Sequence, residues 1–198
     1  GYYVDKTELI YELVHDTRNE VTLFTRPRRF GKTLTMSMME SFFDCSINRD
    51  SRELFQGLDI LEKHPEFCQE WMNQYPVLSL SLKVVEGLTF DSAFKMLKTV
   101  IANICKKNAS LLNEEGIDED DRIKFARLKA ETAGLEDVKN SLVTIMRMMK
   151  AAYGKPVILL IDEYDVPLAK AEASKNKEYY QRMLDVLRGI MSTSLKTN

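Results

Sequence analysis

Histidine and cysteine are scarce in this chain, whose 198 residues include two histidines and three cysteines. Cys45, Cys68 and Cys105 are far apart in the sequence and show none of the paired spacings of a zinc site or a disulfide framework. We interpret each of them as a small apolar residue of the core. A metal centre built on histidine or thiolate ligands is therefore not expected, and any metal ion should have oxygen ligands.

Long apolar segments and an excess of one charge are also absent. The longest apolar run, Val157–Ile161, is far too short to span a bilayer, and no charged-then-apolar leader follows Gly1. These absences predict a cytoplasmic protein with no membrane partner. The 28 Lys and Arg residues nearly balance the 30 Asp and Glu residues, so the net charge does not attract nucleic acid. Nucleic acid could bind only through a local basic patch.

The composition, 44% hydrophobic and 29% charged, is that of a globular protein with one core. Apolar and β-branched runs predict three strands, at 21–25, 76–85 and 156–161. Helical spacing predicts the other elements, at 8–15, 32–44, 91–112, 121–132, 136–152 and 177–195, with two short helices between 51 and 74. Strands that alternate with helices indicate an α/β fold with a parallel sheet, which includes a mainly helical segment at 86–155.

The segment Thr25–Thr33, of sequence TRPRRFGKT, lies between the first predicted strand and the helix at 32–44. A phosphate-binding loop requires this context, because backbone N–H groups at a helix start converge on an anion and glycine lets the chain approach it. Lys32 would then reach the β- and γ-phosphates of a nucleotide, and the Thr33 hydroxyl would bind magnesium. The residues predicted to bind the nucleotide are Arg28, Arg29, Phe30, Gly31, Lys32, Thr33 and Leu34.

This loop departs from the standard phosphate-loop pattern, which has a first glycine where this chain has Arg26. A Gly-Lys-Thr triplet by itself also fits an ordinary helix start. The guanidinium groups of Arg28 and Arg29 could lie near the phosphates or pair with acids such as Asp165, and the sequence leaves both uses open.

Two adjacent carboxylates, Asp162 and Glu163, follow the apolar strand at 156–161. Ligands of open α/β sheets bind at the carboxyl ends of the strands. Asp162 there could hold magnesium, and Glu163 could orient and deprotonate an attacking water. The alternative is that these acids only cap the next turn. Together with the loop upstream, they predict a site for ATP and magnesium.

At this point the chain resembles a known family, the predicted AAA-ATPase-like proteins of bacteria and archaea. The matching segments are Tyr2–Thr7, Leu23–Thr33, Phe55–Leu58, Tyr75–Val77 and Leu160–Asp165, spread over nearly the whole chain. The family's own loop also reads Arg-Pro-Arg-Arg-Phe-Gly-Lys, so the resemblance implies that Arg26 is a family trait. It also implies phosphate and magnesium roles for Lys32 and Thr33, and metal and catalytic-base roles for Asp162 and Glu163.

The resemblance has further implications for architecture. It implies a P-loop NTPase domain of the AAA-like type, often joined to a carboxyl-terminal nuclease-like domain, and it leaves a homo-oligomer open. It also implies a strand after the helix at 177–195 that inserts between the strands at 21–25 and 156–161. We therefore expect residues 1–198 to be the incomplete amino-terminal part of the domain, which is weak or inactive alone. In it those two strands would leave a gap or pair directly in a non-native register. By analogy, Tyr3 and the segment Asp5–Thr7 would lie near the adenine.

Three functions remain open at the level of sequence. The first is an ATPase whose cycle drives or gates an attached effector. The second is a switch or assembly module that binds ATP with negligible turnover, which the missing first glycine favours. The third is a nucleic-acid-binding module that uses Arg26, Arg28 and Arg29, although no nucleic-acid-reading motif accompanies them.

Overall fold

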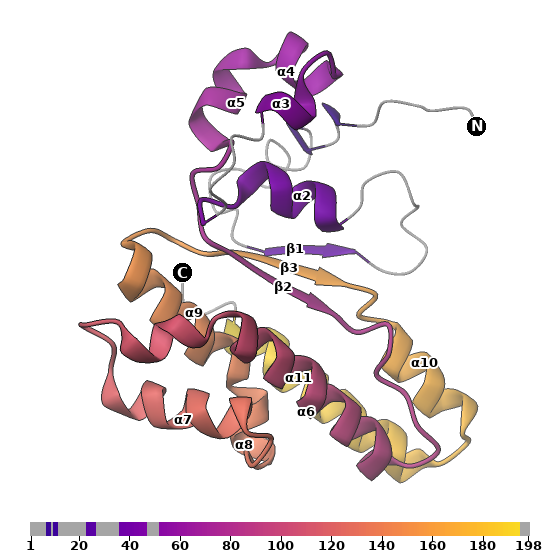
Figure 1. Ribbon diagram of the computed structural model, residues 1–198. Helices are drawn as coiled ribbons and strands as arrows, with labels where there is room; N and C mark the ends of the chain where they lie inside the picture. Colours follow the sequence, from indigo (N-terminus) through magenta and orange to yellow (C-terminus); the bar gives the residue numbers. More distant parts are fainter. Residues whose placement is uncertain (1–6, 9, 12–22, 27–35, 47–51, 195–198) are drawn as a thin grey trace.

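The computed structural model describes residues 7–8, 10–11, 23–26, 36–46 and 52–194. In this part of the chain a small sheet separates two groups of helices (Figure 1). The fold is thus mixed α/β, as the alternation of strands and helices predicts. Among the described residues, no helix is long and apolar enough to cross a membrane.

The sheet has three parallel strands in the order β1-β3-β2: β1 (Leu23–Arg26), β2 (Val77–Ser81) and β3 (Ile158–Asp162). All three lie within or next to the ranges that the apolar runs predict. The central strand β3 is buried at every position from Ile158 to Ile161, because helices cover both faces of the sheet. This two-sided burial explains why its sequence is a continuous apolar run rather than an alternating one.

β1 and β3 are direct neighbours, with Leu23 opposite Leu159 and Arg26 opposite Asp162. Within the described ranges no strand lies between them. Of the two arrangements expected for these strands in residues 1–198, a gap or direct pairing, the structure therefore has direct pairing.

The helices on the first face are α2 (Met36–Phe43), α3 (Arg52–Phe55), α4 (Asp59–Lys63) and α5 (Pro65–Trp71). They enclose a small core against Ile158 and Leu160, built largely of aromatic rings: Phe42, Phe43, Phe55 and Phe67. The segment at 51–74 forms three short helices rather than the two predicted. Gly57, with a φ of +79°, and Pro65, in the first turn of α5, separate them.

The second face holds the larger core, in which Leu159 and Ile161 of β3 pack against the remaining helices. These are α6 (Phe90–Lys107), α7 (Glu119–Lys129), α8 (Leu135–Lys139), α9 (Ser141–Tyr153), α10 (Val166–Ala173) and α11 (Lys177–Ser194), with the short 3₁₀ helix η1 (Ala109–Asn113) after α6. The sequence patterns missed α10. Its buried residues are only Val166, Pro167 and Ala171, so it lacks the stripe of large apolar side chains from which a helix is predicted.

Candidate functional site

The carboxyl ends of the three strands lie at one edge of the sheet, where the arrowheads point in Figure 1. At this edge the register places Asp162 between Arg26 of β1 and Ser81 of β2. Adjacent strands are separated by about 4.8 Å. The chain therefore leaves β1 for the segment 27–35 directly beside the first of the two predicted acids.

The helix after that segment is also in place at this edge. α2 (Met36–Phe43) lies inside the range predicted for the helix at 32–44, and its Met36 end lies on the side of the sheet where β1 ends (Figure 1). The strand before the predicted phosphate loop and the helix after it are thus both present. The predicted nucleotide-binding residues themselves, Arg28, Arg29, Phe30, Gly31, Lys32, Thr33 and Leu34, lie outside the described residues.

Asp162 and Glu163 are both half-buried at the end of β3. The Leu82 N–H donates to the Asp162 carbonyl oxygen at 3.0 Å, and the Val166 N–H donates to the Glu163 carbonyl oxygen at 3.2 Å. These two bonds hold the backbone between β3 and α10. Within the described ranges, no hydrogen bond or ion pair engages the Glu163 carboxylate, so it is available to a ligand or a water molecule.

Glu163 has a left-handed backbone conformation, with a φ of +54°. Glycine and asparagine adopt this conformation readily, but a glutamate pays a steric cost for its Cβ. Asn73, Glu131 and Lys175, which lie outside this edge of the sheet, share the conformation, so it describes the turn after β3 and does not by itself mark a site. The sequence gives no signal for this conformation, because neither glycine nor asparagine marks the position.

We expect the strain to appear in a comparison of two variants. Glu163→Gly should have a free energy of unfolding about 1 kcal/mol above that of Glu163→Ala, because only the alanine retains a Cβ in the left-handed region. Urea unfolding of both variants measures the difference. At Glu172, which is exposed in helix α10, the same pair of substitutions should show the opposite order, because glycine is the poorer helix former. Equal stabilities of Glu163→Gly and Glu163→Ala would contradict the left-handed assignment.

The side chains at this edge are too few to enclose a metal ion by themselves, but they fit a magnesium ion that also binds phosphates and water. Among the described residues, no group of three His, Cys, Asp or Glu side chains could hold a metal ion. Magnesium does not require such a group, since it is usually bound by one or two carboxylates together with substrate phosphates and water. Asp162, an oxygen donor beside the start of the predicted phosphate loop, meets this requirement.

An apolar cleft of about 690 Å³ lies on the opposite face of the sheet from α2, next to Ile161 and Tyr164. Apolar side chains form most of its lining, and of its two cations, Lys139 and Arg188, Lys139 is already paired with Asp185 at 2.6 Å. Phosphate groups require several N–H donors or cations. The cleft therefore does not suit the phosphates of a nucleotide, and the carboxyl edge of the sheet remains the candidate site.

Comparison with known proteins identifies the family. The model of the family described as "Predicted AAA-ATPase" matches residues 1–198. The chain belongs to this predicted AAA-ATPase family. The resemblance based on the loop and the acidic strand is thereby confirmed.

One relative among curated proteins is an "Uncharacterized protein in vnfD 5'region" of Azotobacter chroococcum mcd 1. It is 27% identical to this AAA-ATPase-like chain over 191 residues, which cover 96% of the chain and 30% of the relative. The chain thus spans less than a third of the length of the relative that it matches. No solved structure matches the chain.

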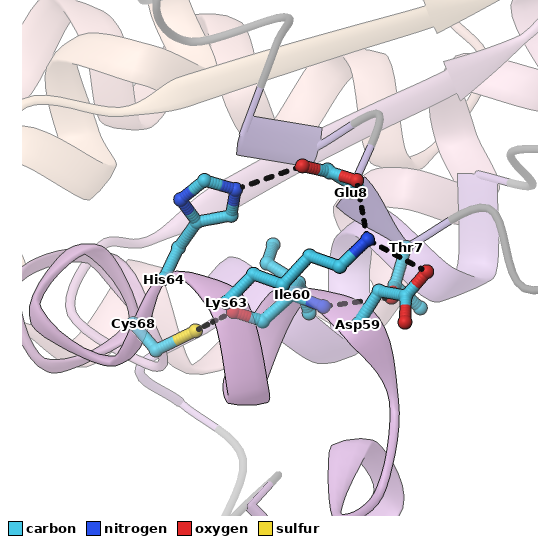
Figure 2. Close-up of polar contacts among 7 residues, drawn as sticks. All are labelled: Thr7, Glu8, Asp59, Ile60, Lys63, His64 and Cys68. Carbon is cyan, nitrogen blue, oxygen red and sulfur yellow. Dashed lines mark hydrogen bonds and ion pairs between the residues drawn. The ribbon is translucent and has the colours of Figure 1, made fainter.

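In this AAA-ATPase-like chain, the described residues of the amino-terminal segment contact α4 and the adjoining His64 (Figure 2), and Tyr11 contacts Phe67 of α5. The Ile60 N–H donates to the Thr7 hydroxyl oxygen at 3.2 Å, so Thr7 satisfies a free backbone donor in the first turn of α4. Tyr3, Asp5 and Lys6, which the resemblance places near the adenine, lie outside the described residues.

Ionic and aromatic contacts hold the same segment of the AAA-ATPase-like chain. Glu8 lies 3.0 Å from His64 Nε2 and 3.4 Å from Lys63 Nζ, and Lys63 also pairs with Asp59 at 3.7 Å (Figure 2). The Tyr11 ring stacks on the His64 ring with a centroid separation of 3.6 Å. The hydrogen bond from His64 and the nearby Lys63 charge lower the pKa of Glu8 below its ordinary value of 4.5.

Because the pKa of Glu8 is lowered, the contribution of these contacts to stability should depend on pH in a predictable way. A carboxylate whose pKa is lower in the folded state stabilises the fold above its unfolded pKa, and this contribution disappears as the pH falls through the folded-state pKa. We therefore expect wild type to be more stable than Glu8→Gln at pH 6, with the difference shrinking towards zero below pH 4.5. Urea midpoints measured across this pH range test the expectation.

The matched control for this titration is Glu62→Gln, on the same helix as Lys63 but without a described side-chain partner. The difference in urea midpoint between wild type and Glu62→Gln should not change comparably with pH. A difference between wild type and Glu8→Gln that stays constant from pH 6 to pH 3.5 would exclude an ionised Glu8 as its source.

Proposed function

We propose that this chain is the nucleotide-binding part of an ATPase, which binds ATP with magnesium and hydrolyses it to drive or gate an attached effector. The observation that most strongly supports the proposal is the parallel sheet, in which β1 and β3 have their carboxyl ends at the same edge. It brings the start of the predicted phosphate loop, in sequence far from Asp162 and Glu163, to the same edge of the sheet. Phosphate binding and water activation need groups of both kinds at one site.

In this proposal Lys32 contacts the β- and γ-phosphates, Thr33 and Asp162 hold magnesium, and backbone N–H groups from Arg28 to Leu34 surround the phosphates. Magnesium would neutralise charge on the phosphate oxygens. Glu163 accepts a proton from the water that attacks the γ-phosphorus, while the bond between that phosphorus and the leaving oxygen of ADP breaks. Its unengaged carboxylate supports this role.

The attached effector is the part of the proposal that depends most on the longer protein. The curated relative continues well beyond the matched region, since only 30% of it is covered. We propose that a further domain of the nuclease-like type, which the resemblance implies, receives the signal of the ATP cycle. Nucleic acid would then affect the ATPase part only indirectly, through that further domain.

A nucleotide-dependent switch with negligible turnover is the second candidate, and Arg26 favours it. Arg26 is the last residue of β1, where the standard loop has a glycine that lets the chain approach the phosphates closely. A looser fit of the phosphates would reduce catalysis more than binding.

Single-turnover measurement separates the two candidates. Full-length protein in excess over radiolabelled ATP and with saturating magnesium should release labelled phosphate if the chain is an ATPase. Bound ATP that remains intact while binding is saturated would support the switch. Absence of magnesium-dependent ATP binding would contradict both.

A further inference from the structure

Two serines of β2 lie on the sheet face that α2 covers. Leu78 and Leu80 belong to the core on the opposite face, and strand residues alternate between faces, so Ser79 and Ser81 point towards the α2 side. The register pairs Ser81 with Asp162, and neighbouring residues of parallel strands share a face. Ser81 and Asp162 are therefore adjacent on one face, at the edge that holds the candidate site.

Packing does not require a hydroxyl group at these positions. The Ser79 oxygen is buried and has no hydrogen-bond partner, which costs free energy rather than supplying it. Because α2 packs across β2, position 79 favours a small side chain, and this preference is enough to explain the serine. Ser81 is half-buried like Ser79, but it differs in that it lies at the end of the strand, beside a carboxylate.

The Ser81 hydroxyl has no hydrogen bond to any residue in the described part of the chain. Because strands are about 4.8 Å apart, rotation about the Cα–Cβ bond of Ser81 can bring its oxygen within hydrogen-bonding distance of the Asp162 carboxylate. A carboxylate offers about four acceptor positions, so it can receive this bond in addition to its other contacts.

We propose that Ser81 is a positioning residue for magnesium, whose hydroxyl donates a hydrogen bond to Asp162 and fixes the orientation of that carboxylate. The inference rests on the proposed function, in which Asp162 holds the ion. Groups that hydrogen-bond to a metal-binding carboxylate set its orientation, and their loss typically weakens metal binding about tenfold or more. Ser81 acts through Asp162 and does not touch the nucleotide.

The test is the magnesium dependence of ATP binding, measured by calorimetry on the full-length protein at a series of magnesium concentrations. Ser81→Ala should raise the magnesium concentration needed for half-maximal ATP binding about tenfold. Its urea midpoint and its ATP affinity in EDTA should match wild type. Ser81→Thr, which keeps the hydroxyl, should restore the wild-type magnesium dependence.

Ser79→Ala is the matched control, because it removes a hydroxyl from the same face two positions earlier. It should leave the magnesium dependence unchanged. A wild-type magnesium dependence in Ser81→Ala, or equal weakening in Ser81→Ala and Ser79→Ala, would overturn the assignment. If Ser81→Ala does not fold, Ser81→Cys, which replaces the hydroxyl with a weak donor of similar shape, should show the same tenfold shift. Wild-type protein whose ATP affinity is the same in EDTA and in saturating magnesium would instead remove the proposed function itself.

Discussion

Lys32→Ala is expected to weaken the binding of magnesium-ATP at least about tenfold, or to abolish it. In the proposed function Lys32 is the cation that contacts the β- and γ-phosphates, and a backbone N–H group carries no charge that could replace its ammonium group. A tenfold change in affinity corresponds to about 1.4 kcal/mol, which is modest for the loss of a charged contact to a phosphate. Isothermal calorimetry with ATP and saturating magnesium measures it.

The control for Lys32→Ala is Lys83→Ala. Lys83 is an exposed lysine just beyond the end of β2, at the same edge of the sheet, and has no described ion pair. Its loss should change ATP affinity much less than tenfold, because it contributes only to the general field around the site. Unchanged affinity in Lys32→Ala would contradict the site assignment. An equal loss of ATP affinity in the two variants would show that ATP binding depends only on the total charge of the protein.

The elements that flank the site were the most predictable from the sequence. β1 and β3 are short apolar runs bounded by polar residues, and α2 has Met39, Phe42 and Phe43 at helical spacing. Such patterns depend on neighbours within a few residues, and burial on one or two faces determines them. The parallel pairing also follows from the pattern, because helices separate successive strands.

The contacts that the sequence did not predict join residues far apart in the chain. Thr7 caps α4 through Ile60, which is 53 residues away, and the periodicity of either segment is the same whether or not they meet. The left-handed conformation of Glu163 likewise results from the way β3 joins α10, and glutamate is not a residue type that marks it. Local patterns therefore predicted where the two acids lie but not the backbone geometry that presents them.

The pairing of Asp162 with Ser81 also depends partly on the local sequence pattern and partly on the strand register. The alternation of leucine and serine in 78–82 predicts that the serines share one face of β2. Only the register with β3 shows that Ser81, and not Ser79, is level with Asp162. A shift of one residue would move every side chain of β2 to the other face, so this contact depends on the fold as a whole.

Glu163→Gln is expected to retain ATP binding and to lower ATP turnover by at least about a hundredfold in the full-length protein. The amide has nearly the shape of the carboxylate but cannot accept the proton of the attacking water, and general-base catalysis typically contributes a factor of about 10² to 10⁴. Magnesium binding should persist, because Asp162 keeps its charge. The affinity for magnesium-ATP by calorimetry and the single-turnover rate of phosphate release measure the two effects separately.

Glu172→Gln provides the control for Glu163→Gln, since it makes the same chemical change at an exposed position of the neighbouring helix α10. It should leave both binding and turnover unchanged. The left-handed backbone at position 163 adds a further distinction, because glutamine has the same Cβ as glutamate and should not relieve the strain. Glu163→Gln should therefore unfold at the wild-type urea concentration, so that lost turnover reports chemistry rather than folding. Turnover at the wild-type rate would mean that another group takes the proton, and loss of ATP binding would mean that Glu163 contacts the nucleotide or its metal directly.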